Sequence, residues 1–308
     1  MPLPLQKTIY QKPTLPLTSL INKLQDRGLR ILDSKVADNA LNFIGYYRLR
    51  GYFYPFYFKR DPADKVPVEP KFFVSETTFD DVIALYDFDR KLRLHILEQI
   101  QKVEIGLRTC LSEHMSSHYG PHWFMNLSVL SPAYEYEKFF DQIKGAKETF
   151  IEHYHQRYDT PRYPPSWMII ETLSFGAWSK MYKALLPRDQ KAIALKFNVK
   201  SYEVMGSWFH TLSHLRNLCA HHNRVWNRTF LAFPPAKAKG LEQHMQKPHT
   251  LYSRLVVLKY LSDQVSYDDE LKAHLQLLMK QPPGCVEWGM MGFVEGWEQT
   301  ALWRNTAP

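Results

Sequence analysis

The stretch "TTFDDVIALYDFDRKLRLHILEQIQKVEIGLRTCLSEHMSSHYG" (residues 77–120) carries the longest helical pattern in the chain. Its apolar residues recur every three or four positions, which places them on one face of an α-helix. They are Val82, Leu85, Ile96, Ile100, Val103, Leu107, Leu111 and Met115. The pattern ends at Gly120 and Pro121, because neither residue readily continues a helix.

Further helical patterns follow along the chain. They cover residues 131–158, 166–186, 187–197, 199–227, 251–265 and 268–281, with an interruption or bend expected at Gly176. The sequence therefore predicts an all-α fold, with one small β-element near residues 52–79 and a polar loop or hairpin tip over residues 59–70. We expect three parts, 1–80, 81–232 and 233–308, within one compact unit. The 203–228 helix is expected to pack beside the 164–185 helix.

Composition limits the class of protein without deciding it. The 308 residues are 45% hydrophobic, which is typical of a globular chain. The net charge of +8 fits either a polyanionic partner or a merely basic surface. Aromatic residues can stack on unpaired bases, but they also fill cores. We expect cytoplasmic residence, because no signal pattern and no membrane-length apolar run occurs. The three cysteines, Cys110, Cys219 and Cys285, suit a reducing compartment.

The segment "LSHLRNLCAHHNRVWN" (residues 212–227) is unusually polar for a predicted helix. Steps of four and three place six side chains in one continuous polar stripe: His210, His214, Asn217, His221, Arg224 and Arg228. Arg216 lies off this stripe, at about 140° from His221 on a straight helix. A long arginine side chain or a partner helix is needed to bring both to one substrate.

Four interpretations of this segment are open. A solvated face normally favours Lys and Glu, which are absent from the stripe. A zinc site at His210 and His214 lacks a third ligand at a convincing spacing. A Cys219–His222 nucleophile pair is a third interpretation, although a lone cysteine on a helix usually belongs to the core. Phosphodiester chemistry is the fourth. Arginine fits phosphate oxygens and histidine exchanges a proton near neutral pH, and a ribose 2′-hydroxyl nucleophile requires no metal or cofactor.

Arg216, Asn217 and His221 match the R-x4-6-H signature of HEPN ribonucleases, in its R-N-x-x-x-H form. The chain resembles the bacterial abortive-infection (AbiD/AbiF-like, Abi-like) family. Four further blocks carry the resemblance: "IGYYRLRGYFYPF" (44–56), "VEIGLRTCLSEHMSSHYGPHWF" (103–124), "PPSWMIIETLSFGAWSKMYKAL" (164–185) and "MGFVEGWEQTALW" (291–303). The resemblance implies a HEPN-type helical bundle with N- and C-terminal extensions. It also implies a phage-defence toxin that acts as a metal-independent endoribonuclease, forms a homodimer and binds RNA, including a small regulatory RNA.

The resemblance also implies roles for individual residues. His221 would be the general acid or base, Arg216 would stabilise the phosphorane charge, and Asn217 would hold His221 or the phosphate. Glu171 falls where the family places an acidic residue, and it would either anchor Arg216, act on His221 or form a structural salt bridge. His222 would support the site. The candidate phosphate contacts are Arg224, Arg228, Lys237 and Lys239.

A second string, "RTCLSEH", also satisfies the signature with Arg108 and His114. On one helix these two side chains diverge by about 120°. Glu104 lies four residues before Arg108, which is a favourable ion-pair spacing. The string is therefore either a structural Glu104–Arg108 pair or a second half-site. Two function classes follow from the sequence: a ribonuclease, or a non-catalytic RNA-binding module or toxin partner.

Overall fold

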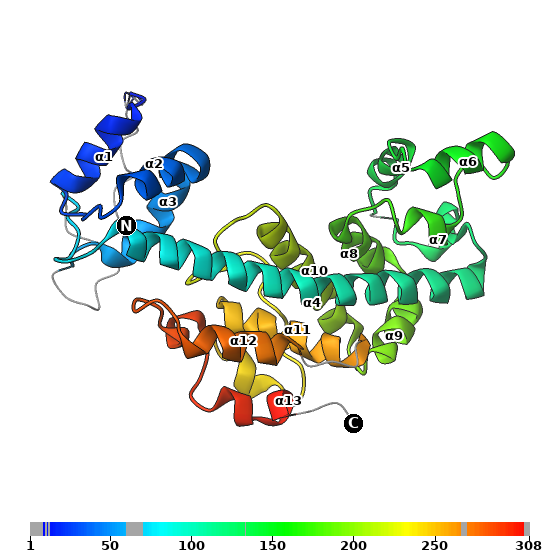
Figure 1. Cartoon of the computed structure of the whole chain (residues 1–308). Helices are drawn as coiled ribbons and strands as arrows, with labels where there is room; N and C mark the ends of the chain where they lie inside the picture. Colours follow the sequence, from blue (N-terminus) through cyan, green and yellow to red (C-terminus); the bar gives the residue numbers. More distant parts are fainter. Residues whose placement is uncertain are drawn as a thin grey trace. The chain divides into compact units, whose positions relative to one another are not determined.

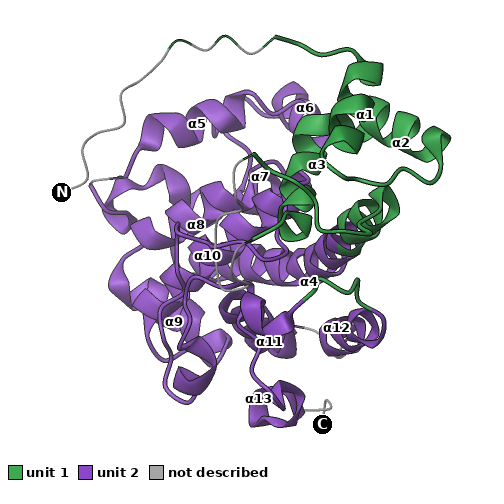
Figure 2. Ribbon diagram, turned by 90° about the vertical axis from the view of Figure 1, so that its left-hand side faces the viewer, with its two compact units in different colours: residues 1–88, 282–286 green, residues 89–281, 287–308 purple. Residues whose placement is uncertain are grey.

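The computed structural model describes residues 9, 11, 13–59, 70–132, 134–265 and 270–304. The chain divides into two compact units (Figure 2). Unit 1 comprises Met1–Phe88 and Pro282–Val286, and unit 2 comprises Asp89–Gln281 and Glu287–Pro308. The described residues form helices and turns with three isolated β-bridges and no sheet, so the predicted all-α fold is confirmed. Of the helices described, none is long and apolar enough to cross a membrane.

Unit 1 is built from short helices and the beginning of α4. Its helical elements are α1 (Leu17–Asp26), α2 (Ser34–Ala40), a π-helical turn (Leu41–Gly45), α3 (Tyr46–Phe53) and a 3-10 turn (Tyr54–Phe56). Asp33 caps α2, since its side chain accepts a hydrogen bond from the Lys35 backbone N–H at 2.8 Å. Among the described residues, the β-element expected near residues 52–79 is reduced to two isolated bridges, an antiparallel one between Tyr57 and Phe73 and a parallel one between Arg30 and Thr78. The predicted loop over 59–70 lies mostly outside the described residues.

The longest helix, α4 (Phe79–Tyr119), begins in unit 1 and ends in unit 2 (Figure 1). All eight apolar residues predicted to share one face of this helix are fully buried, at 0% exposure. The sequence pattern therefore identified the packed face correctly. Gly106 marks a close approach in unit 2, because an added Cβ would lie 2.8 Å from Val265 Cγ1.

After α4, the described part of unit 2 contains nine further α-helices. They are α5 (Tyr136–Lys144), α6 (Thr149–Arg157), α7 (Ser166–Ile169), α8 (Phe175–Ala184), α9 (Pro187–Lys196), α10 (Tyr202–Ala220), α11 (Leu251–Val265), α12 (Glu270–Lys280) and α13 (Ala301–Arg304). Helix α10 packs on α8, α9 and α11, and its side chains Trp208, Phe209, Leu212 and Leu215 are fully buried. The expected neighbourhood of the 203–228 and 164–185 segments is confirmed by the α8–α10 packing.

The interruption expected at Gly176 lies just before it, because Ser174 caps α8 by accepting a hydrogen bond from the Ala177 N–H at 3.2 Å. Two predicted helices have the wrong extent. The 131–158 segment forms two helices, α5 and α6, rather than one. The 199–227 segment is helical only to Ala220. The second correction matters most, since the predicted functional residues lie where this helix ends.

Candidate functional site

Helix α10 ends in a turn that presents polar side chains to solvent. The Asn223 N–H donates to the Leu218 carbonyl at 2.8 Å, and the His222 N–H donates to the Cys219 carbonyl at 3.1 Å. These two bonds form a Schellman motif, in which the residue after the C-cap is left-handed. His222 occupies that position with φ of 57°, and both His221 and His222 are exposed.

A buried carboxylate on α4 fixes the chain beyond this turn. Asp89 Oδ1 accepts hydrogen bonds from the backbone N–H groups of Val225, at 3.1 Å, and Trp226, at 2.7 Å. The other Asp89 oxygen pairs with Arg93, and both side chains are buried. The six-residue polar stripe predicted for one helix is therefore wrong: His210, His214 and Asn217 lie on α10, whereas the other three members follow its end.

The predicted catalytic arginine joins a cluster of alternating charges. Arg216 Nε lies 3.4 Å from Glu104 Oε2 on α4, and the other Glu104 oxygen pairs with Arg108. Burial lowers the pKa of Arg108 and nearby Arg216 lowers it further, whereas Glu104 and Glu171 oppose this shift. Glu171 thus lies near Arg108, while the carboxylate that contacts Arg216 is Glu104. The expected Glu104–Arg108 pair is confirmed.

The two residues of the second signature string, Arg108 and His114, contact different carboxylates. His114 is buried and lies with Nε2 3.1 Å from Asp189 Oδ1 on α9. Asp189 also accepts a hydrogen bond from the Tyr119 hydroxyl at 2.9 Å. Arg108 is held by Glu104 instead, so the structure does not bring Arg108 and His114 to one place.

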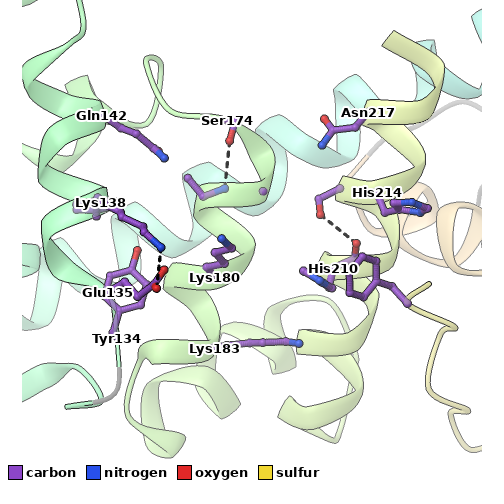
Figure 3. A pocket seen from close by; sticks show the side chains of 15 residues that line it. Tyr134, Glu135, Lys138, Gln142, Ser174, Lys180, Lys183, His210, His214 and Asn217 are labelled. Carbon is purple, nitrogen blue, oxygen red and sulfur yellow. Dashed lines mark hydrogen bonds and ion pairs between the residues drawn. The ribbon is translucent and has the colours of Figure 1, made fainter. Parts of the chain in front are cut away.

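A cleft of about 510 Å³ opens between α5, α8 and α10 (Figure 3). Three lysines point toward it, Lys138 from α5 and Lys180 and Lys183 from α8, and Lys138 pairs with Glu135 at 2.8 Å. Helix α10 contributes His210, His214 and Asn217 to the opposite wall. The lining is therefore predominantly basic, and Asn217 connects it to the exposed end of α10.

The two cleft histidines pack against an aromatic ring. The Phe233 ring centroid lies 3.9 Å from that of His210 and 5.4 Å from that of His214. Burial lowers the pKa of His210, with further lowering by Lys183 and His214. Burial also lowers the pKa of His214, helped by Arg254 and Arg228. Both imidazoles are thus poised to be neutral at pH 7. Within the described part of the chain, no third potential zinc ligand lies beside His210 and His214.

The predicted phosphate contacts lie near opposite ends of α10. Lys237 and Lys239 line a second cavity of about 330 Å³ together with Ser201 and Val204, at the start of the helix. Arg224 and Arg228 follow the other end, with their guanidinium groups 5.8 Å and 6.0 Å from the ring centroids of Trp226 and Phe230. The 19 residues of α10 span about 28 Å, so the four cations do not form one patch along the helix.

Sequence reasoning missed the lysines of the cleft. Lys180 and Lys183 are three residues apart on α8, which places them on one helix face. That spacing was visible, but only the tertiary fold shows which helix face looks toward α10. The Cys219–His222 interpretation loses its nucleophile, because Cys219 is buried and burial raises its pKa to about 12.

The fold and the site together define an all-α protein with a lysine-lined cleft beside a helix end that carries a half-buried Arg216 and the exposed Asn217 and His221. The chain belongs to the Abi-like protein family, whose model matches residues 39–227 and thus includes Arg216, Asn217 and His221. This family points to a role in abortive infection, a form of phage defence. Comparisons with curated proteins and with solved structures gave no match.

Proposed function

We propose that this Abi-like protein is a metal-independent endoribonuclease of HEPN type that acts in phage defence. The observation that carries the proposal is the position of three residues at the end of a helix whose remaining turns are largely buried: Asn217 and His221 are exposed, and the Arg216 side chain is 34% exposed. A merely solvated helix face would favour Lys and Glu there. A cluster of a permanent cation, an amide and a titratable imidazole suits phosphodiester cleavage.

The chemistry requires only groups that this chain supplies. His221 takes the proton from a ribose 2′-hydroxyl, whose oxygen then attacks the adjacent phosphorus. Arg216 stabilises the negative charge of the phosphorane, and Asn217 orients the phosphate from the cleft side. The bond to the 5′-oxygen breaks, and that oxygen receives a proton from a second histidine or from water. The products are a 2′,3′-cyclic phosphate and a 5′-hydroxyl.

The cleft between α5, α8 and α10 is the proposed path of the RNA. Lys138, Lys180 and Lys183 supply cations for phosphates, and such contacts contribute affinity by releasing counterions. Phe233, which is 45% exposed, offers a ring for base stacking in the same cleft. Binding to a long transcript and binding to a small regulatory RNA would use the same surface.

We propose a symmetric homodimer as the active unit, with His221 near the twofold axis. Glu104 draws Arg216 toward α4, whereas His221 lies in the turn that leaves α10. A second protomer would place its own His221 opposite the first and supply the second proton-transfer group. Mass measured by light scattering, with cleavage assayed across protein dilution, tests this: activity should fall as the dimer dissociates.

The decisive experiment incubates the purified protein with RNA and with matched DNA in excess chelator and analyses the new ends. We expect cyclic-phosphate and 5′-hydroxyl ends from RNA only. Cleavage that disappears with chelator, that cuts DNA equally or that survives His221→Ala would refute the mechanism. RNA binding without cleavage would instead support the second candidate function, a non-catalytic RNA-binding module or toxin partner. The lysine-lined cleft favours that candidate, because binding there does not require Arg216.

A further inference from the structure

Three potential metal ligands meet between α4 and α12 of unit 2, away from the cleft-lining residues. His95 and Glu98 lie one turn apart on α4, and His274 comes from α12. One ligand atom from each residue lies within 4.8 Å of the other two. Glu98 Oε2 is 3.5 Å from His274 Nδ1 and 3.9 Å from His95 Nδ1.

One of these ligand atoms lacks a hydrogen-bond partner among the described residues. His274 Nδ1 is buried from solvent and makes no hydrogen bond to the described residues, although it faces the Glu98 carboxylate. Buried polar atoms are normally satisfied, so such an atom calls for an explanation. A metal ion bound to this nitrogen and to Glu98 would satisfy both groups.

The two imidazole rings of the cluster are stacked on each other. Their ring centroids are 4.0 Å apart and their planes differ by 27°.

We propose that His95, Glu98 and His274 bind one divalent transition-metal ion of the zinc type. Two imidazoles and one carboxylate form a known zinc ligand set, with water in the fourth tetrahedral position. Bonds of about 2.0–2.2 Å separate tetrahedral ligand atoms by roughly 3.4 Å. The two separations from Glu98 Oε2, 3.5 Å to His274 Nδ1 and 3.9 Å to His95 Nδ1, approach this value.

The bound ion would fasten α12 to α4. The same two helices are joined beside it by Glu270, which accepts from Lys102 Nζ at 2.5 Å and from Gln99 Nε2 at 3.1 Å. The metal ion would add coordination bonds between α12 and α4, and these bonds form only in the folded state. The proposed link between the two helices is independent of the metal-free cleavage proposed for Arg216 and His221.

The test uses the full-length protein, stripped with chelator and dialysed, and titrated with Zn²⁺ by calorimetry. We expect one ion per chain, a higher melting temperature with Zn²⁺, and the visible absorption of four-coordinate Co²⁺ when cobalt replaces zinc. His274→Ala should weaken binding by at least about tenfold. The matched control is His153→Ala on α6, an exposed histidine outside the cluster, which should bind as the unsubstituted protein does.

Glu98→Gln provides a second ligand variant at a side chain that is 46% exposed, so it keeps the test valid if His274→Ala does not fold. Circular dichroism of each metal-free variant verifies folding. Stoichiometry well below one, or equal affinity in the ligand variants and in His153→Ala, would overturn the proposal in favour of adventitious binding by surface histidines. RNA cleavage in excess chelator is measured separately from metal binding. Failure of the metal-site proposal can therefore be distinguished from failure of the proposed ribonuclease function.

Discussion

Arg216 and Arg108 share one carboxylate, Glu104, although they lie on different helices. Glu104 and Arg108 are both on α4 and are largely buried, whereas the Arg216 side chain on α10 is 34% exposed. The shared carboxylate couples a structural ion pair to the arginine proposed for catalysis. The two arginines should therefore respond differently to truncation.

Arg108→Ala is expected to destabilise the protein by about 3–5 kcal/mol, because it leaves the buried Glu104 without its nearer partner. Arg216→Ala should cost less than about 1 kcal/mol, as is usual for a partly exposed pair. Its effect on RNA cleavage should be a loss of about 10²–10³-fold in rate. Urea unfolding and single-turnover cleavage measure the two quantities. Equal destabilisation by both substitutions would contradict this division of roles.

His221→Ala should reduce cleavage by about 10²–10⁴-fold while leaving the free energy of unfolding nearly unchanged, because His221 is exposed. His222→Gly is the matched control. Glycine preserves the left-handed turn at no steric cost, so the end of α10 should keep its geometry. We expect the glycine variant to retain cleavage if His221 is the proton-transfer group. Loss of cleavage in His222→Gly alone would move that role to His222.

Asp89→Ala should destabilise unit 2 by about 3–5 kcal/mol, because it removes a buried ion-pair partner of Arg93 and the acceptor of two backbone N–H groups. Asp89→Asn retains a carbonyl acceptor for these N–H groups and should cost less. Both variants should also reduce RNA cleavage, since the segment after His221 loses its anchor. Denaturant titration ranks the two variants, and the reverse order would contradict the assigned role.

RNA affinity should fall steeply with salt. Lys180→Ala and Lys183→Ala should each lower the slope of log affinity against log salt by about one if the lysine contacts a phosphate. The pair Lys237→Ala and Lys239→Ala tests whether RNA also reaches the start of α10. Fluorescence anisotropy with labelled RNA across a salt series provides the measurement. An unchanged slope in the Lys180 and Lys183 variants would exclude the cleft as the RNA path.

Acid should destabilise the folded protein. Burial lowers the pKa of His95, His122, His210, His214 and His244 below their ordinary value of 6.5. Between that value and the lowered pKa, the unfolded chain binds more protons than the folded one. The free energy of unfolding should therefore decrease as the pH falls below 6.5, and the decrease should level off below the folded pKa values. His214→Gln should make the decrease shallower, whereas exposed His153→Gln should not, as urea midpoints at pH 7.5 and 5.5 would show.

The local sequence pattern was sufficient to predict buried residues and neighbouring helices where packing follows helical periodicity. The eight apolar residues of α4 are buried as predicted, and the 164–185 and 203–228 segments supply the neighbouring helices α8 and α10. The local pattern did not predict where α10 ends, because a residue distant in the sequence determines that end. The periodicity of residues 199–227 continues past Ala220, but Asp89 captures the backbone at Val225 and Trp226 and so favours a turn.

The same limit applies to the functional residues. The acidic partner of Arg216 was sought at Glu171, but the fold brings Glu104 to it from a different helix. His274 lies far from His95 and Glu98 in sequence, so no spacing rule connects the three. Glu104 was recognised only as the partner of Arg108, because helical spacing reveals neighbours on one helix and not across two.

Burial of the native thiols has a practical consequence for labelling. It raises the pKa of Cys219 to about 12 and of Cys285 to about 11, and it also raises that of Cys110. Maleimide and iodoacetamide reagents attack the thiolate, so the three native sulfurs should react slowly at pH 7. A cysteine introduced as His153→Cys can then carry a dye without prior removal of the native cysteines. Energy transfer between a dye at this position on one protomer and a dye at the same position on another would report protomer association in real time.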